Sequence, residues 1–295
     1  MLRDLLLILF WAGFSIPAAA DPTDDLLCHG KAIQGGLLIC SAPAGSTLVA
    51  SSAASTREIP VDATGIATIG LQQAEAEEIS LSVTGTDIPP LTLPIAPRED
   101  PYRVIDGFDC DKVDARTPEQ IEHAGQSWVK KRDAFETFSL GRGALDGFVP
   151  PAEGQMSSPF GPTRKYIGVG KDGKACEKVS VHQGYDLAVP VGTEIVAPAA
   201  GTVILGDPDL YYEGGTVFLD HGAGLVSVFM HMSEVDVVAG QAVQQGERLG
   251  ASGNTGRTTG PHLHWAVKWR NPGSEDRGDD FYIDPALLLE LEPAP

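Results

Sequence analysis

The sequence predicts a mainly β protein with a small N-terminal β-sandwich, a helical connector and a C-terminal domain of the β-hammerhead, barrel-sandwich-like type. The 34 Gly and 22 Pro among 295 residues indicate many turns. Short segments of alternating apolar and polar residues, the pattern of half-buried strands, recur on both sides of one longer stretch with helical spacing. The length also allows about two domains of the usual size.

Residues 1–20 have the pattern of a secretory signal peptide. Arg3 precedes an apolar run from Leu5 to Phe14, and an A-x-A cleavage site ends at Ala20. A membrane span needs ~20 apolar residues, and this run is shorter. We therefore expect cleavage, export to the periplasm or the medium, and no membrane span in the mature protein. An uncleaved anchor is the alternative.

Residues 21–96 are expected to form the small β-sandwich module. In one of its segments Ile79, Leu81 and Val83 alternate with polar residues and share one face. Six such segments in about 70 residues suit a sandwich. No catalytic grouping occurs among them, so we expect a spacer or binding module without chemistry of its own. The six segments are 35–42, 46–52, 57–61, 65–71, 78–85 and 91–96.

Residues 97–150 are expected to form a linker and a connecting helix. Thr117 is a plausible N-cap, Pro118 suits the first helical position, and Gln120 completes a capping box. An apolar stripe at helical spacing should pack against a neighbouring domain, while His123 lies off the stripe and should be solvated. The stripe consists of Ile121, Ala124, Trp128, Phe135 and Phe138.

The C-terminal domain, residues 151–292, contains two similar segments, 190–206 and 237–253. Each has the pattern of a strand, a tight turn and a strand. This is typical of β-hammerheads, which also occur in biotinyl and lipoyl carrier domains. Those carriers need a lysine at a hairpin tip, and neither segment offers one. The sequence therefore disfavours a carrier.

Charge and cysteine content limit the function further. A net charge of −19 argues against nucleic-acid binding and against docking on anionic lipid. Four cysteines, with no C-x-x-C spacing, suit disulfides in an oxidising compartment and disfavour a thiolate metal site. Three pairings are conceivable. We favour Cys28–Cys40 with Cys110–Cys176, because the first pair would lie within one small domain.

Histidines concentrate in the C-terminal domain and suggest a metal site. His262 and His264 stand two residues apart in a predicted strand, so they share a face. His182 precedes Asp186 by four residues, and His231 ends another predicted strand. A catalytic zinc ion usually takes three protein ligands and keeps one position for water. His182, Asp186 and one of the 262/264 pair would provide such a set.

His221 and Arg164 also lie in this part of the chain. His221 follows a predicted strand, and we expect it to hold the turn by hydrogen bonding rather than to bind the metal. Arg164 either contacts substrate or organises its own segment, and the sequence does not decide between these roles.

Three segments together resemble the lysostaphin/LytM-type zinc endopeptidases, which cut peptides of bacterial peptidoglycan. The resemblance extends over about residues 155–287. It implies that His182, Asp186 and His264 bind one Zn²⁺ and that His231 and His262 are catalytic. The segments are HQGYDLAVPVGTEIVAPAAGTV, LDHGAGLVSVFMHMS and VQQGERLGASGNTGRTTGPHLHW.

The resemblance implies a secreted endopeptidase that hydrolyses amide bonds in peptidoglycan stem peptides or cross-links. In a Gram-negative wall the expected bond is the D-Ala–diaminopimelate cross-link. The alternative is a non-enzymatic regulator of a cell-wall amidase, and an amidase or a divisome protein is the expected partner class. Two departures from the family stand out: Phe229 replaces a common Tyr, and residues 171–178 look like an insertion.

Overall fold

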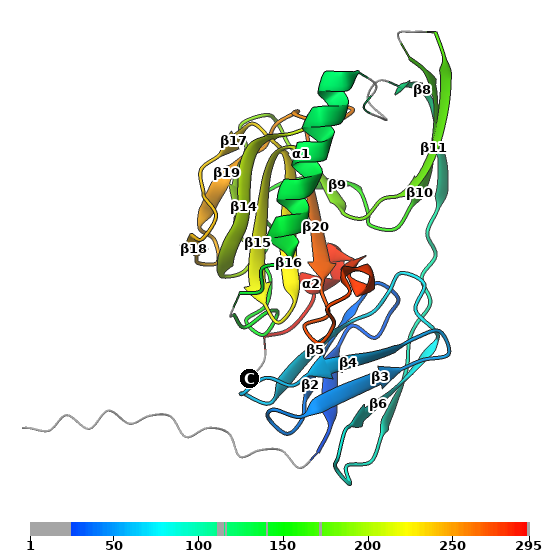
Figure 1. The fold of residues 1–295 in the computed structure, drawn as a ribbon, viewed down its shortest axis with the longest axis vertical. Coiled ribbons are helices and arrows are strands. Elements are labelled where there is room, and N and C mark those ends of the chain that lie inside the picture. Colours follow the sequence, from blue (N-terminus) through cyan, green and yellow to red (C-terminus); the bar gives the residue numbers. More distant parts are fainter. Residues whose placement is uncertain (1–24, 111–114, 116, 140, 171–172, 294–295) are drawn as a thin grey trace, which may run out of the picture.

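The computed structural model describes residues 25–110, 115, 117–139, 141–170 and 173–293. The signal peptide predicted at residues 1–20 lies outside this part. The mainly β fold class is confirmed, and one long helix crosses the face of the C-terminal sheet (Figure 1). Within the described ranges, no helix is both long and apolar enough to cross a membrane.

The N-terminal part consists of two facing antiparallel sheets, as predicted for a sandwich. All six expected strands form, because their alternating apolar residues enter one core, as in β6, where Ile79, Leu81 and Val83 are buried. One sheet contains β1 (Leu27–Gly30), β2 (Leu37–Ser41) and β5 (Ile66–Gly70). The other contains β4 (Thr56–Pro60), β3 (Thr47–Ser51), β6 (Glu78–Val83) and β7 (Leu91–Pro94).

The two disulfides have the favoured pairing. Cys28 of β1 is bonded to Cys40 of β2 across an antiparallel pair. Strand β1 was not predicted, because its four residues are short and mostly exposed. Cys110 is bonded to Cys176 and thereby joins the chain after β8 to β11.

Strands β8 (Tyr102–Asp109), β10 (Thr163–Val169) and β11 (Ala175–Val181) form a three-stranded arm that projects from the molecule (Figure 1). Strand β8 lies in the predicted linker and pairs in parallel with β10. Strand β11 overlaps the predicted insertion and pairs with β10 as a hairpin.

Helix α1 (Pro118–Phe135) begins as predicted, but its packing face differs from the prediction. Thr117 and Gln120 form the expected capping box. Trp128 and Ile121 of the predicted stripe are more than half exposed, so that part of the prediction is wrong. The helix instead packs through Ser127 and Ala134, because small side chains allow close approach to the sheet.

His123 also differs from the prediction, since it is half-buried rather than solvated. Its Nε2 donates to the carbonyl of Asp209, 2.8 Å away. Phe135 is the one aromatic residue of the predicted stripe that packs inward, with its ring 4.7 Å from that of Phe218.

The C-terminal part is built on an eight-stranded sheet, and its two similar segments pair with each other. Strand β13 pairs with β19, and β14 pairs with β18, so the two segments together close the hammerhead region. The large sheet has the order β18 (Ala242–Val243), β14 (Gly201–Leu210), β15 (Gly214–Gly222), β16 (Leu225–Met232), β20 (Leu263–Trp269), β12 (Tyr185–Ala188) and β9 (Gln155–Ser158), with β21 (Phe281–Ile283) beside β20. The small sheet contains β13 (Glu194–Val196), β19 (Arg248–Ala251) and β17 (Glu234–Val235). The short helices η2 (Arg277–Asp279) and α2 (Pro285–Leu288) flank β21.

The N-terminal sandwich and the C-terminal sheet share one continuous hydrophobic core. Trp269 of β20 is fully buried, and its indole N–H donates to the carbonyl of Thr68, 3.2 Å away. Gly70 lies against this indole, since a Cβ there would lie 2.6 Å from it. The sandwich is therefore fixed to the far end of β20, the strand that begins at the H-x-H motif.

Candidate metal centre

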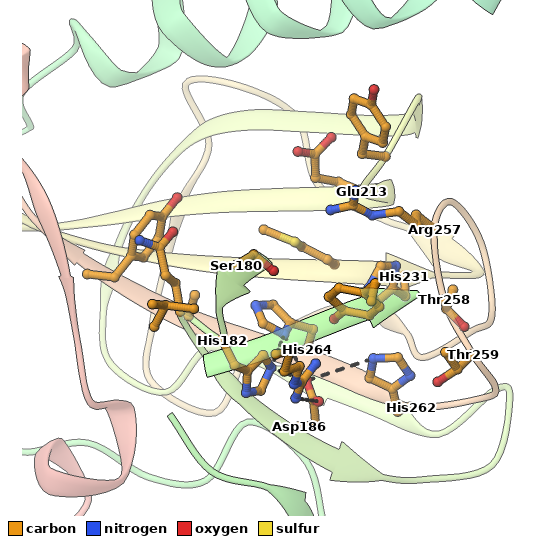
Figure 2. A pocket seen from close by; sticks show the side chains of 18 of the residues that line it. Ser180, His182, Asp186, Glu213, His231, Arg257, Thr258, Thr259, His262 and His264 are labelled. Atoms are coloured by element: carbon orange, nitrogen blue, oxygen red, sulfur yellow. Dashed lines mark hydrogen bonds and ion pairs between the residues drawn. The ribbon is translucent and has the colours of Figure 1, made fainter. Parts of the chain in front are cut away.

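Four chain segments bring the predicted site residues together (Figure 2). Asp186 of β12 lies opposite His264 of β20 in the antiparallel register. His182 directly follows β11, and His231 lies near the end of β16, which is the other neighbour of β20. His262 immediately precedes β20, so the H-x-H motif places both rings at one end of a strand held on both edges.

His182, Asp186 and His264 form a compact cluster of possible metal ligands. Asp186 Oδ1 lies 3.0 Å from His182 Nε2 and 2.8 Å from His264 Nδ1. The two ring nitrogens are 3.2 Å apart. Ligands of a tetrahedral zinc ion at ~2.0–2.2 Å would stand about 3.3 Å from one another. The three atoms therefore fit three corners of such a site after small adjustments.

Hydrogen bonds to backbone carbonyls fix the ring orientation of three histidines. The Nδ1 atoms of His182, His231 and His262 lie 2.7, 2.9 and 2.8 Å from the carbonyl oxygens of residues 159, 255 and 260. A carbonyl only accepts, so each Nδ1 carries the proton and each Nε2 keeps its lone pair. His264 differs, because its Nδ1 faces Asp186. The Nε2 atom of His182 is therefore available as a metal ligand. The Nε2 atoms of His231 and His262 are available as bases.

Asp186 is held on both of its oxygens. While Oδ1 faces the histidines, Oδ2 lies 3.3 Å from Nη2 of Arg164, which also donates to Ser158 Oγ at 2.7 Å. Arg164 therefore helps to organise the cluster, and it also lines the cleft beside it. Its guanidinium leaves Oδ1 as the carboxylate oxygen that faces the metal position.

Gly184 is a site residue that the sequence reasoning missed. A Cβ at this position would lie 2.4 Å from Cε1 and Nε2 of His264, so a larger residue would displace that ring. The only signal in the sequence was a glycine midway between His182 and Asp186. The backbone at His231 is also unusual, with a φ of +65° that places its ring beside His262 at a centroid distance of 4.8 Å.

The electrostatics of the site favour an ionised carboxylate at Asp186 and neutral imidazoles at His231 and His264. Burial tends to raise the pKa of Asp186, but the contacts of its carboxylate with His182 and His264 outweigh burial and hold the pKa below its usual range. Burial, reinforced by the nearby His264 and His262, lowers the pKa of His231 to about 3. Burial also lowers the pKa of His264. These are the protonation states that metal binding requires.

His221 lies outside the cluster, as expected. It is fully buried, and its ring nitrogens lie 2.9 Å from the carbonyl of Ala200 and 2.8 Å from Ser227 Oγ. The same hydroxyl accepts from the indole N–H of Trp265 at 3.1 Å. His221 thus holds the hidden face of β20, on the side opposite to the metal ligands.

The cluster opens into a cleft of about 320 Å³. Arg164 and Lys178 of the arm form one wall, and the loop that carries Arg257 forms another. Figure 2 shows Glu213 and Arg257 across the cleft from Asp186. The guanidinium of Arg257 lies 4.9 Å from the centre of the Tyr212 ring. The cleft is therefore lined largely by polar and charged side chains and is open to solvent.

Comparison with known proteins identifies this region. Residues 180–276, which include all five predicted site residues, match the model of peptidase family M23. An uncharacterised metalloprotease of Haemophilus influenzae is 42% identical over 116 residues, which are 38% of this chain and 22% of that protein. The peptidoglycan DD-endopeptidase ShyA of Vibrio cholerae is 33% identical over 147 residues, 50% of this chain and 31% of that protein. The chain thus matches only about a fifth to a third of the length of these relatives.

A solved structure extends the similarity beyond the catalytic region. The crystal structure of a Pseudomonas aeruginosa protein described as a peptidase M23 has a TM-score of 0.59 and 28% identity. The match covers 88% of this chain and 96% of that one, so it includes the N-terminal part. The family resemblance read from the sequence is confirmed: the chain contains a peptidase family M23 domain at residues 180–276.

Proposed function

We propose that this protein is an exported, zinc-dependent endopeptidase that hydrolyses amide bonds in peptidoglycan stem peptides or cross-links. The main supporting observation is the cluster of His182, Asp186 and His264, with its three ligand atoms within 2.8–3.2 Å of one another. The named activity of ShyA, a peptidoglycan DD-endopeptidase, supports this substrate class.

The three cluster residues would hold the zinc ion through His182 Nε2, Asp186 Oδ1 and His264 Nδ1. A zinc ion there would supply a Lewis acid and lower the pKa of a water ligand to about 7. The hydrogen bond from His182 Nδ1 to the backbone and the contact of Arg164 with Asp186 would orient two of the ligands.

We assign the proton transfers to His231 and His262. Nε2 is unprotonated in both rings, since both Nδ1 protons are donated to carbonyls, and the two ring centres lie 4.8 Å apart. Either can accept the proton of the attacking water. The resulting imidazolium then donates to the developing oxyanion or to the leaving nitrogen.

Export and domain roles complete the proposal. Residues 1–20 would direct the chain to the periplasm or the medium, where the two disulfides are stable. Residues 21–96 would form the sandwich module, residues 97–150 the connector, and residues 151–292 the endopeptidase domain. A partnership with a cell-wall amidase or a divisome protein belongs to the alternative function, in which the domain regulates another enzyme.

Metal binding and hydrolysis of purified sacculi test the proposal together. The mature protein should bind one zinc ion, and His264→Ala should lose most of that affinity. His231→Ala should keep the ion but digest sacculi at least a hundredfold more slowly, the typical range for loss of a proton-transfer group. A zinc-loaded protein that leaves sacculi intact would favour the regulatory alternative. Equal digestion by His231→Ala would contradict the role of His231.

A further inference from the structure

The turn between β9 and β10, residues 159–162, holds His182 by three hydrogen bonds. The backbone N–H of His182 donates to the carbonyl of Pro162, and the carbonyl of His182 accepts from the N–H of Gly161, both at 2.9 Å. The ring Nδ1 donates to the carbonyl of Pro159 at 2.7 Å. The position of Nε2, the ligand atom assigned above, therefore follows the position of this turn.

Two side chains from earlier parts of the chain hold the same turn. Arg98 of the linker donates through Nη2 to the carbonyl of Phe160 at 2.9 Å, and its guanidinium lies 4.9 Å from the centre of the Phe160 ring. Gln73, which follows β5 of the sandwich, donates through Nε2 to the carbonyl of Gly161 at 2.9 Å. Two successive carbonyls of the turn are thus bound from outside the C-terminal part.

Asp100 joins these two side chains to each other. Its carboxylate accepts from Arg98 Nε at 2.9 Å and from Gln73 Nε2 at 2.6 Å. A Cβ on Gly161 would collide with this carboxylate, so Asp100 lies directly against the turn. The backbone N–H of Arg98 also donates to the side-chain oxygen of Gln34 in the sandwich at 3.0 Å. The side chains of Arg98 and Asp100 are only 13% and 15% exposed, so water competes little for these contacts.

We propose that Gln73 and Arg98 are positioning residues for His182, so that the sandwich and the linker set the zinc affinity of the metal centre. They would act in two steps without touching the ion. Each side chain holds a carbonyl of the turn, and the turn holds the backbone and the ring of His182. The sandwich would then be part of the metal site and not a spacer. This inference rests on the metal centre of the proposed function, but it concerns zinc affinity and not hydrolysis.

Other contacts join the same two parts of the molecule without reaching the turn. The hydroxyl of Thr68, a buried residue of β5, donates to the carbonyl of Ala223 beside β16. Its loss in Thr68→Val should lower stability without moving residues 159–162. Thr68→Val is therefore the matched control, because it distinguishes a positioning role from a general role in joining the sandwich to the C-terminal sheet.

Zinc affinity, measured by competition with a chromophoric chelator, tests the proposal. Gln73→Leu and Arg98→Met each remove a hydrogen bond to the turn. Each should weaken zinc binding about tenfold, the low end of the range for loss of an outer contact of a metal ligand. Arg98→Lys should recover part of the affinity, because an ammonium can still donate to the carbonyl of Phe160. Thr68→Val should bind zinc as tightly as wild type while unfolding at a lower temperature.

The His182→Ala background shows whether the effect passes through His182. Asp186 and His264 remain in this background, so weaker zinc binding can still be measured. Without the His182 ring the turn has no ligand to orient, so adding Gln73→Leu should no longer lower the affinity. Proton NMR of the protein before zinc is added gives a second readout. The Nδ1 proton of His182 should exchange with water faster in Gln73→Leu than in Thr68→Val.

Three results would overturn the positioning role. They are wild-type zinc affinity in both Gln73→Leu and Arg98→Met, an equal loss of affinity in Thr68→Val, and a loss that persists in the His182→Ala background. The proposed activity is tested separately. If the affinities follow the expected pattern but the zinc-loaded wild type leaves sacculi intact, the endopeptidase function fails while the positioning role stands.

Discussion

At the scale of single residues, the candidate metal centre is organised by groups that contact its side chains on the side away from the metal position. His182, His231 and His262 each donate Nδ1–H to a backbone carbonyl, which sets both tautomer and ring direction. Arg164 does the same for Asp186 by holding Oδ2. Because these contacts hold the rings and the carboxylate in fixed orientations, little reorganisation would accompany metal binding.

Arg164→Gln should therefore weaken zinc binding although Arg164 is not a ligand. Loss of a group that orients a metal ligand typically costs 10–100-fold in metal affinity. Competition with a chromophoric chelator measures this affinity, and Arg164→Lys should recover part of it because an ammonium can still bind Oδ2. Lys165→Gln, which alters the opposite face of the same strand, is the control. Unchanged affinity in Arg164→Gln would contradict the orienting role.

Because His221 is buried in its neutral form, the protein should be less stable in mild acid than at neutral pH. Burial lowers the pKa of His221 to about 4, whereas an unfolded histidine titrates near 6.5. The unfolded state therefore takes up a proton first as the pH falls. The associated stabilisation is complete above about pH 6.5 and is lost towards pH 4, with a total of about 3 kcal/mol.

Urea denaturation across this pH range tests the role of His221. The free energy of unfolding of wild type should fall more steeply between pH 6.5 and 4 than that of His221→Gln. The comparison of slopes matters, because other histidines titrate in both proteins and their effect cancels. Parallel slopes would show that His221 is not the group responsible.

The clustering of the predicted ligands could be expected from the sequence, because much of it depends on local geometry. Two-residue spacing in a strand puts His262 and His264 on one side, and His182 and Asp186 lie within five residues of each other. The partners of these residues are distant in sequence: Arg164 precedes Asp186 by 22 positions. Gly184 was missed because its importance comes from the approach of β20, which only the fold brings about.

At the scale of elements, α1 is the helix for which the spacing of apolar residues predicts the wrong packing face. Helical spacing of apolar residues predicts an inward stripe only if a hydrophobic surface faces it. Here the facing surface includes polar groups, so α1 meets it through Ser127 Oγ, which accepts from the backbone N–H of Tyr211 at 3.0 Å, and through Lys131 and Glu213. The strands were predicted more accurately, because a strand with one face buried in the core has alternating apolar and polar residues.

Ala134→Leu should destabilise the protein more than loss of a large aromatic residue from the same helix. Ala134 is 6% exposed against the sheet, so added methylenes would overpack the contact and cost about 1–3 kcal/mol. Trp128→Ala should change the free energy of unfolding by less than about 0.5 kcal/mol, because Trp128 is 57% exposed. Thermal or urea unfolding of both variants measures the two changes in the free energy of unfolding. A larger loss in Trp128→Ala would mean that α1 packs as the sequence suggested.

At the scale of the whole molecule, the N-terminal sandwich and the M23 domain behave as one body. Their buried residues form a single cluster, and Trp269 joins them at the far end of the strand that carries His264. The buried guanidinium of Arg57, which is paired with Glu75, also lies 5.7 Å from the centre of the Trp269 ring. The strands of each part could be predicted, but this junction could not, since nothing local marks Gly70 as the contact for an indole.

Trp269→Ala should therefore destabilise both parts together. Truncation of a fully buried tryptophan typically costs about 3–5 kcal/mol. Wild type should unfold in a single calorimetric transition, and the variant should unfold at lower temperature or in two steps, with the sandwich separating first. Two independent transitions already present in wild type would contradict the single-body description.

We propose that this protein cleaves peptide cross-links with a zinc centre built from His182, Asp186 and His264 and with His231 in proton transfer. Mass spectrometry of muropeptides after incubation with zinc-loaded mature protein tests it most directly. We predict that cross-linked dimers disappear and monomers accumulate with wild type, while His231→Ala leaves the profile unchanged. An unchanged profile with the zinc-loaded wild type, or equal loss of dimers with His231→Ala, would contradict the claim.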